Sequence, residues 1–278
     1  MRVMEECGME ITSRDNRFVR EMRRLLSDAK ARRESGRFVL EGARLCGDAL
    51  RSEVRVEAVL TTPRAAAQNA ALLDALREAC GECHTISAPL AGYIGDTVTP
   101  QGIFCICRME RPVPVLDNPA AFGTIRKNGR YLALENMQDP TNLGTIIRTA
   151  EAFGLDGLLL SDGCCDLYNA KVLRGSMGGV LRLPSFAAGD LARTVPALRE
   201  MGFTCWACVA DSAAVPLHRA SLGNGCVCLI GNEGAGLRGE TIAACTGRLT
   251  IEMTGRAESL NAAMAAGIVL WEMVRPVR

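Results

Sequence analysis

Residues 136–154 read NMQDPTNLGTIIRTAEAFG, a polar turn that runs directly into an apolar helical pattern. Apolar side chains surround Arg148 in this pattern, so we expect the cation on the buried side of the helix. Two later stretches share the plan of strand, tight glycine or serine loop and helix: LIGNEGAGL at 229–237 and IEMTGRAESLN at 251–261. Three loops of this kind can line one pocket.

Strands and helices alternate regularly from residue 129 onward. Short apolar runs predict strands at 131–134, 157–160, 181–186, 203–209, 227–230 and 249–253. Helical patterns lie at 143–153, 166–176, 191–201, 237–244 and 259–274. Apolar strands separated by helices predict a mostly parallel, doubly wound sheet. Ligands of such sheets bind beyond the carboxyl ends of the strands, which is where the three loops lie.

The chain has 278 residues, more than a single domain usually contains. Its first part predicts a separate α/β domain over residues 1–110, because strand and helix patterns alternate there as well. Residues 111–128 contain Pro112, Pro114 and Pro119 with little periodicity, which is typical of a stiff linker. We therefore expect a first domain at 1–110, a linker at 111–128 and a second domain at 129–278.

Charge is distributed unevenly along the chain. The net charge of +1 does not by itself predict a polyanionic partner, but residues 13–37 contain nine basic residues against four acidic ones. Phe18, Met22 and Leu25 recur at helical spacing within this segment, so it forms a basic amphipathic helix. Two interpretations stay open: a solvated helix face with some ion pairing, or a surface that contacts RNA phosphates.

The thirteen cysteines lie mostly inside apolar, strand-like runs, which favours buried thiols over a disulfide framework. The C-x-x-C-H pattern at 80–84 matches a haem-attachment motif, but Gly81 ends a helical run and no secretory signal is visible, so we favour a helix end. The pair Cys205 and Cys208 lies in a predicted strand, which favours core packing over redox chemistry. With two histidines, a metal site is disfavoured. No apolar run is long enough to cross a membrane, and we expect a cytoplasmic protein.

The common nucleotide-binding signatures are missing from the loops: no G-x-G-x-x-G follows a strand, and 231–237 lacks the ending of a phosphate-binding P-loop. The three loops resemble instead the three motifs of the SpoU (TrmH-like) family of RNA 2′-O-ribose methyltransferases, in the SPOUT superfamily. The first motif resembles 136–154 with Asn142 and Arg148, the second 229–237 with Asn232 and Glu233, and the third 251–261 with Ser259 and Asn261.

This resemblance implies a C-terminal α/β domain with a trefoil knot that holds S-adenosylmethionine. It also implies a set of cofactor-binding residues: Leu229, Ile230, Gly231, Asn232, Ile251, Met253, Ser259 and Leu260. Apolar side chains there suit the adenine ring, and Gly231 permits close approach of the backbone.

Methyl transfer to a ribose hydroxyl requires positioning and charge stabilisation. Family accounts cast the arginine as the proton acceptor. A guanidinium is always protonated, so we expect Arg148 to stabilise the developing 2′-alkoxide and to contact the adjoining phosphate. The residues expected to orient the ribose and Arg148 are Asn142, Glu233, Ser259 and Asn261. Structural alternatives exist: Asn142 or Ser259 as a helix cap, and Glu233 as a helix N-terminal charge.

The N-terminal part, at residues 11–13 and 38–44, is similar to the L30e-like substrate-binding domain of family members that act on large-subunit ribosomal RNA. Residues 171–178 resemble a family stretch that approaches RNA, although a helix-end charge explains them equally well. The candidate RNA contacts are Arg14, Arg17, Arg20, Arg24, Arg44, Lys171 and Arg174.

The sequence thus predicts a homodimeric, metal-free, S-adenosylmethionine-dependent 2′-O-methyltransferase of ribosomal RNA, most consistent with large-subunit RNA. The alternatives are a transfer-RNA methyltransferase of the same fold and a knotted RNA-binding protein without catalytic turnover. The sequence does not name the modified nucleotide, because proteins recognise RNA by shape and by splayed bases rather than by a residue code.

Overall fold

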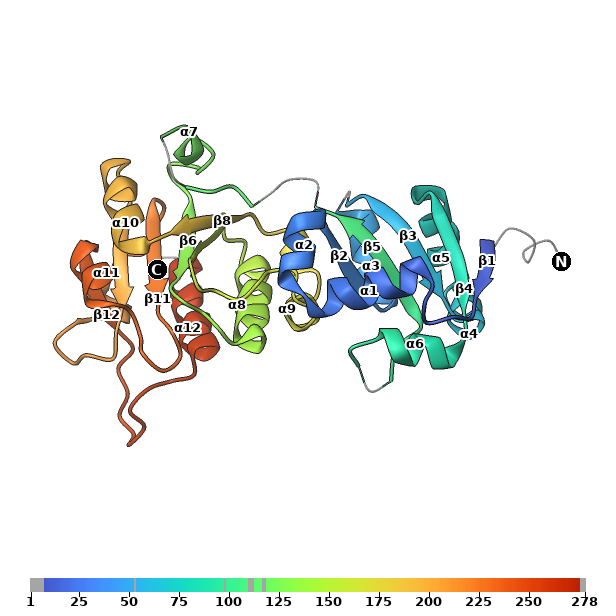
Figure 1. Ribbon diagram of the computed structural model, residues 1–278. Coiled ribbons are helices and arrows are strands. Elements are labelled where there is room, and N and C mark those ends of the chain that lie inside the picture. Colours follow the sequence, from blue (N-terminus) through green and yellow to red (C-terminus); the bar gives the residue numbers. More distant parts are fainter. Residues whose placement is uncertain (1–7, 53, 98, 110–112, 117–118, 276–278) are drawn as a thin grey trace. The chain divides into compact units, whose positions relative to one another are not determined.

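The computed structural model describes residues 8–275 except 53, 98, 110–112 and 117–118. The chain forms two compact units, which are described separately. The first contains residues 1–112 and 166–181, and the second contains residues 113–165 and 182–278. Both units are α/β, as the sequence predicted (Figure 1). The boundaries at 110 and 128 stay a prediction, and part of the expected linker lies outside the described residues.

The first unit has a five-stranded mixed sheet in the order β1-β4-β3-β5-β2. Its strands are β1 (Gly8–Ile11), β2 (Arg37–Glu41), β3 (Val56–Thr61), β4 (Glu82–Ile86) and β5 (Ile103–Arg108). Its helices are α1 (Arg17–Ser27), α2 (Ala29–Ser35), α3 (Ala43–Arg51), α4 (Pro63–Gln68), α5 (Ala70–Ala79) and α6 (Ala88–Ile94). Apolar residues of α1 and α6 join one buried cluster, and those of α3 and α5 join another. Strand side chains alternate between these clusters, so helices cover both faces of the sheet.

Helix α9 (Ala170–Ser176) packs with the first unit, although the sequence suggested a helix at 166–176 that covers the C-terminal sheet. Arg32 is buried and its Nε lies 2.7 Å from Asp166 Oδ2. The Phe38 and Tyr168 rings are 4.6 Å apart, and Leu173 is part of the same core as α3 and α5. The expected placement is therefore wrong, because these tertiary contacts leave no signal in local periodicity.

The second unit has a seven-stranded sheet in the order β10-β12-β9-β11-β6-β7-β8. The strands are β6 (Arg130–Leu134), β7 (Gly157–Ser161), β8 (Ser185–Gly189), β9 (Thr204–Cys208), β10 (Val215–Pro216), β11 (Cys226–Ile230) and β12 (Gly247–Thr250). Every described pairing in this sheet is parallel, which confirms the predicted parallel arrangement. The carboxyl ends of β6, β11 and β12 consequently lie at one edge. Strand β10 was not predicted, and β8 begins four residues later than expected, after Pro184.

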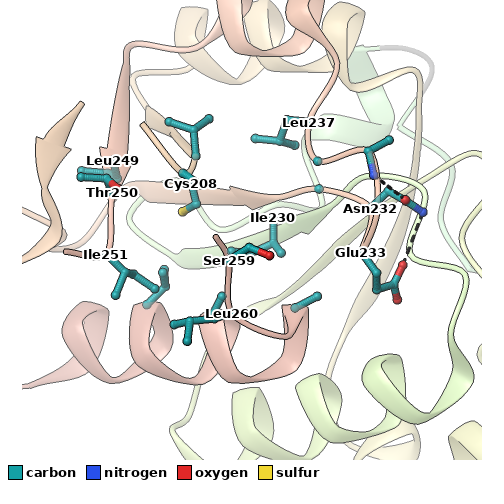
Figure 2. A pocket seen from close by; sticks show the side chains of 18 of the residues that line it. Cys208, Ile230, Asn232, Glu233, Leu237, Leu249, Thr250, Ile251, Ser259 and Leu260 are labelled. Carbon is teal, nitrogen blue, oxygen red and sulfur yellow. Dashed lines mark hydrogen bonds between the residues drawn. The ribbon is translucent and has the colours of Figure 1, made fainter. Parts of the chain in front are cut away.

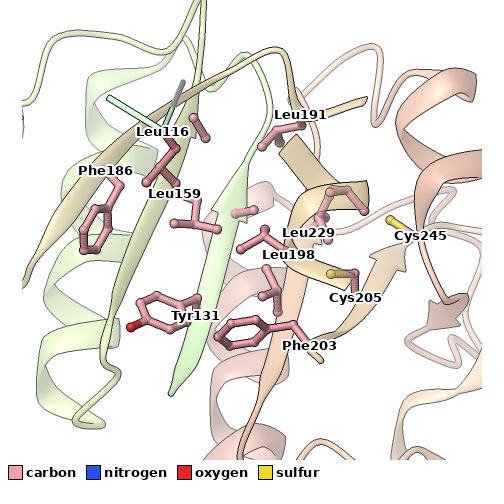
Figure 3. Close-up of a cluster of buried hydrophobic side chains, with 14 of the residues drawn as sticks. Leu116, Tyr131, Leu159, Phe186, Leu191, Leu198, Phe203, Cys205, Leu229 and Cys245 are labelled. Carbon is pink, nitrogen blue, oxygen red and sulfur yellow. The ribbon is translucent and has the colours of Figure 1, made fainter. Parts of the chain in front are cut away.

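Helices cover both faces of this sheet. A short α7 (Pro119–Phe122) precedes it, and the covering helices are α8 (Pro140–Ala152), α10 (Leu191–Glu200), α11 (Gly239–Ala244) and α12 (Ala262–Val274). Leu191 and Leu198 of α10 pack with Tyr131, Leu159 and Leu229 in one buried cluster (Figure 3). Helices α8 and α12 pack against each other, and α12 also contacts β11. No described helix is long and apolar enough to span a membrane.

A buried carboxylate ties the end of β6 to the start of α11. Glu135 is 3% exposed, and its oxygens accept hydrogen bonds from the Arg238 backbone nitrogen at 2.8 Å, from Arg238 Nε at 3.0 Å and from Thr241 Oγ1 at 2.5 Å. The Glu135 nitrogen donates to the Ile230 oxygen at 2.9 Å. Asp190 and Glu135 together raise the pKa of Arg238, which keeps the cation charged. Glu135 therefore fixes both ends of the segment between β11 and α11.

Replacing Glu135 by alanine should remove the three hydrogen bonds and leave Arg238 without its inner partner. We expect the free energy of unfolding, measured by urea denaturation, to fall by about 2–4 kcal/mol. The matched control is Glu240→Ala, because Glu240 is an exposed partner of the same arginine at 3.8 Å. An exposed pair contributes about 0–1 kcal/mol, so equal losses in the two variants would contradict this assignment.

Candidate functional site

The three loops singled out in the sequence meet at the carboxyl edge of the second unit's sheet. The first follows β6 and enters α8, the second joins β11 to α11, and the third joins β12 to α12. Register sets the first two loops side by side, since Leu134 pairs with Ile230 at the ends of their strands. Each loop therefore starts where its strand leaves the sheet, as expected for a parallel α/β site.

The second and third loops line a half-open, mainly apolar cavity of about 410 Å³. Seven of the eight residues predicted to bind the cofactor line it: Ile230, Gly231, Asn232, Ile251, Met253, Ser259 and Leu260. Ile230, Ile251 and Leu260 approach the cavity from different segments (Figure 2). Leu229 does not line it, because successive strand side chains point to opposite faces and Leu229 lies in the buried cluster of Figure 3.

A tight loop forms one wall of this cavity. The backbone groups of Asn232 and Gly236 exchange two hydrogen bonds of 3.0 Å, and Asn232 Oδ1 accepts from the Gly234 and Ala235 nitrogens. A side chain on Gly231 would overlap the backbone of Gly236 and Leu237, so glycine is required there. Asn232 Nδ2 also donates to the Asn136 oxygen at 2.9 Å, which ties the second loop to the first.

A second, polar cavity of about 510 Å³, shallow and open to solvent, adjoins the first. The two share a wall made of Asn232, Glu233, Ser259, Leu260 and Ala262. The rest of the polar cavity is lined by Gln138, Asp139, Asn142 and Asn261. An apolar chamber that opens beside a polar one can hold a largely apolar ligand next to a hydrogen-bonding ligand.

A chain of amide hydrogen bonds orders the polar cavity. Asn261 Nδ2 donates to Asn142 Oδ1 at 3.0 Å, and Asn142 Nδ2 donates to Glu233 Oε1 at 3.1 Å. The same Glu233 oxygen accepts from the Asp139 nitrogen at 3.3 Å. One side chain from each of the three loops takes part, so the predicted residues Asn142, Glu233 and Asn261 are held together as a unit.

The helix ends exclude Asn142 and Ser259 as helix caps. Helix α8 begins at Pro140 with Asp139 as its cap, so Asn142 lies inside the helix. Asn261, not Ser259, caps α12, through its Oδ1 and the nitrogens of Ala263 and Met264. Glu233 is separated from the start of α11 at Gly239, but its Oε1 accepts from the backbone nitrogen of Asp139, the cap of α8, so it lies at the N-terminus of that helix instead. Helix α12 thus begins three residues later than the sequence suggested.

Arg148 lies on the exposed side of α8, whereas the sequence predicted the buried side. Its side chain is exposed, it lines neither cavity, and no hydrogen bond or ion pair joins it to another described residue. It shares an exposed face of α8 with Thr141 and Thr145, at helical spacing, while Ile146 and Ile147 are buried. The expectation of a buried-side arginine is wrong, because apolar neighbours in sequence occupy other faces of the helix.

The predicted RNA contacts differ in their availability. Arg17 pairs with Glu82 at 2.8 Å, Arg24 with Glu34 at 3.7 Å, and Arg174 with Asp96 at 2.9 Å. The remaining four are exposed and form no ion pair with a described residue: Arg14, Arg20, Arg44 and Lys171. All seven belong to the first compact unit.

The two cysteine pairs singled out in the sequence lie at a helix end and in strands. All described cysteines are free. Burial raises the pKa of Cys205 to about 12, so its thiol is a poor source of thiolate for redox chemistry. Cys80 ends α5 and Cys83 lies in β4. Within the described ranges, no group of three or more His, Cys, Asp or Glu side chains could hold a metal ion.

Sequence reasoning missed several residues of the site. Glu135 and Asn136 precede the first helix, and Asn136 has a positive φ of 53°, a strained conformation that is rare outside glycine. Asp139 followed by Pro140 is a recognisable helix start and would have corrected the helix boundary. Other cavity residues lie in ordinary apolar runs without a distinguishing signal: Cys208, Leu217, Leu237, Leu249, Ala265 and Val269.

Known proteins resemble the chain over nearly its whole length. The profile of the SpoU rRNA Methylase family matches residues 129–271, and that of the MRM3-like substrate binding domain matches residues 16–105. The 23S rRNA (guanosine(2553)-2′-O)-methyltransferase RlmP of Bacillus subtilis is 30% identical over 95% of this chain and 98% of its own length.

Solved structures agree with this match. An AdoMet-bound rRNA methyltransferase from Sinorhizobium meliloti has a TM-score of 0.79 and 30% identity, covering 95% of this chain and 97% of that chain. The SpoU methyltransferase AviRb from Streptomyces viridochromogenes, in complex with AdoMet, has a TM-score of 0.79 and 26% identity, covering 93% and 97%. Since both the family profile and a full-length relative match, the chain belongs to the SpoU family of rRNA methylases.

Proposed function

We propose that the protein transfers a methyl group from S-adenosylmethionine to a ribose 2′-hydroxyl of RNA, with large-subunit ribosomal RNA as its substrate. The observation that carries this proposal is the pair of cavities, one apolar and one polar, with a common wall. The names of the relatives, a 23S rRNA 2′-O-methyltransferase and an AdoMet-bound rRNA methyltransferase, support the same reaction.

The apolar cavity suits the cofactor. Its volume of about 410 Å³ lies within the range of sites for molecules of this size. Ile230, Ile251 and Leu260 supply apolar surface for the adenine, and the loop backbone at Gly231 supplies polar groups at close range. When bound, the cofactor provides a methyl group on a positively charged sulfur. We assign the sugar of the substrate to the polar cavity, where the shared wall brings it next to that methyl group.

The reaction forms a bond between the 2′-oxygen and the methyl carbon and breaks the bond from that carbon to sulfur. S-adenosylhomocysteine leaves with the sulfur electron pair, and the hydroxyl proton passes to water. We assign Asn142, Glu233, Ser259 and Asn261 to orienting the ribose. The amide hydrogen-bond chain supports this assignment, because it fixes the orientation of the Glu233 carboxylate. Its Oε1 accepts from Asn142, and its Oε2 accepts a longer bond of 3.4 Å from Asn232. A site held rigid before the substrate arrives lowers the barrier of reaction.

We further propose that the enzyme is a homodimer formed through α12. This helix is apolar on nearly all sides, and its exposed side includes Met264, Ile268 and Trp271, which are 62%, 39% and 54% exposed. A helix that is apolar all round is normally covered. Trp271 also contacts Phe153 at the end of α8, so this stripe adjoins the helix that carries Arg148. Arg148 would then stabilise the 2′-alkoxide in the site of the partner subunit.

The trefoil knot implied by the family resemblance is part of the same proposal, as is a cytoplasmic location. The free cysteines support a reducing compartment.

The reaction is tested by incubating the protein with radiolabelled S-adenosylmethionine and separated large-subunit, small-subunit and transfer RNAs. Label in a 2′-O-methyl nucleotide of large-subunit RNA supports the proposal. Label restricted to transfer RNA contradicts the substrate, and RNA binding without label contradicts catalysis.

Arg148→Lys should lower kcat by about 100-fold, the effect of losing a well-placed donor to a developing oxyanion. The dissociation constant for S-adenosylmethionine should stay within about 2-fold, because Arg148 lines neither cavity. Single-turnover kinetics and calorimetry measure the two quantities. Arg193→Lys, a change at an exposed arginine elsewhere in the same unit, is the control. A lysine variant of full rate would remove Arg148 from the reaction.

Gly231→Ala should weaken cofactor binding by more than about 10-fold, because the new methyl group would overlap the backbone at Gly236 and force the loop to move. Gly234→Ala is the matched control: its added carbon would meet the Asn232 side chain at an ordinary 3.6 Å. Calorimetric titration with S-adenosylhomocysteine measures both. If the two variants bind alike, this loop does not form the cofactor site.

Ile268→Arg should convert the dimer to a monomer in sedimentation velocity, because it places a charge in an apolar interface. Val115→Arg, at another exposed apolar residue of the same unit, should leave the mass unchanged. Mixing Arg148→Lys with Gly231→Ala subunits then tests the shared site. Activity should return in the mixture if Arg148 serves the partner subunit, and its continued absence would place Arg148 in its own subunit's site.

A further inference from the structure

An exposed tyrosine on the first unit lies between two helices and next to two arginines. Tyr93, near the end of α6, is 36% exposed. The guanidinium carbon of Arg14 lies 4.5 Å from the centre of its ring, and that of Arg23 lies 5.0 Å from it. Both distances are within the range of a cation–π interaction.

The position of this ring is fixed by the core beneath it. Phe18 and Met22 of α1 pack in the same buried cluster as Leu90 and Ile94 of α6. Tyr93 and Arg23 therefore project from helices that are anchored to one sheet face, rather than from loops. A ring held in place in this way loses little conformational freedom when a ligand stacks on it.

The cations around Tyr93 are not neutralised within the described chain. Arg14, Arg20 and Arg23 form no ion pair with a described carboxylate, whereas Arg17 on the same helix pairs with Glu82. Glu21, an acidic residue of α1, is engaged by Arg37 at 2.6 Å. Arg20 and Arg23 are three residues apart on α1 and both are exposed, so they share one side of the helix. The result is a local excess of positive charge around one aromatic ring.

These groups match the chemistry of an unpaired nucleotide. RNA-binding proteins stack unpaired bases on aromatic rings or on the planar guanidinium of arginine, and neutralise phosphates with nearby cations. A double helix offers no base face to such a ring, because its bases are stacked on each other. A role limited to holding α1 against α6 would not require uncompensated charge at Arg20, which makes no contact with the ring.

We propose that Tyr93, Arg14 and Arg23 form a stacking site for an unpaired base of the RNA substrate, with Arg20 contacting an adjoining phosphate. This inference rests on the proposed function, since it takes the substrate to be RNA, and adds the recognition of a single-stranded nucleotide by the first unit. The site lies wholly within that unit, whereas the two cavities lie wholly within the second.

The test uses the full-length protein and unmodified large-subunit ribosomal RNA made by transcription. Tyr93→Ala should weaken RNA binding and raise KM for RNA by about 10- to 100-fold, the effect of losing one base–aromatic stack. Tyr93→Phe should bind as tightly as the wild type, because the ring is kept. The cofactor dissociation constant and kcat at saturating RNA should not change in either variant, and the thermal midpoint shows that both are folded.

Charge is tested separately. Replacing Arg20 by alanine should reduce the slope of log affinity against log salt by about 0.7, the value for one lost phosphate contact on a single strand. Arg64→Ala, at an exposed arginine of α4 away from this site, should change RNA affinity by no more than about 2-fold. A short single-stranded oligonucleotide should compete with the ribosomal RNA, and a duplex of the same sequence should not.

Two failures can be told apart. If the wild type methylates RNA but Tyr93→Ala binds it with unchanged affinity and KM, the stacking site is wrong and the proposed function stands. If the wild type neither binds nor methylates any RNA, the proposed function itself is wrong. A loss in Tyr93→Ala that is matched by Tyr93→Phe would also overturn the stacking site, because the hydroxyl and not the ring would then be responsible.

Discussion

The parallel pairing of β6 with β11 is the constraint on which the site depends. It places Leu134 beside Ile230, so that both strands end at the same height and their loops begin side by side. Glu135 then continues from β6 and binds the start of α11, which closes the second loop at its far end. Without this shared edge, the polar residues of the first loop would not reach Glu233.

Different interactions therefore shape the two cavities of the site: packing shapes the apolar one, and hydrogen bonds shape the polar one. Close backbone packing at Gly231 and apolar side chains shape the first cavity. An added atom at Gly231 would overlap the neighbouring backbone. Hydrogen bonds shape the second cavity, where the buried Asn142 amide is paired with the exposed side chains of Asn261 and Glu233. Because Asn261 also caps α12, the last helix cannot shift without disturbing this hydrogen-bond chain.

The first unit contributes a different kind of surface. Its core is divided between the two sheet faces, and the cations on α1 are divided between those paired with carboxylates and those left free. Arg23 of α1 and Arg14, which precedes that helix, lie against the exposed ring of Tyr93. The two proposals assign methyl transfer to the second compact unit and the stacking of an unpaired base to the first, so each can be altered without the other.

The sequence by itself determined the α/β class, the parallel C-terminal sheet and most of the residues proposed for the cofactor that line the apolar cavity. These follow from local signals: short apolar strands, glycines where the backbone is crowded, and polar loops at strand ends. It could not place Arg148, because neighbours along a helix point to different sides and exposure depends on which side the sheet covers. It could not assign α9 to the first unit either. That placement rests on contacts such as Arg32 with Asp166, between residues more than a hundred positions apart, and long-range contacts of this kind exist only once the chain has folded.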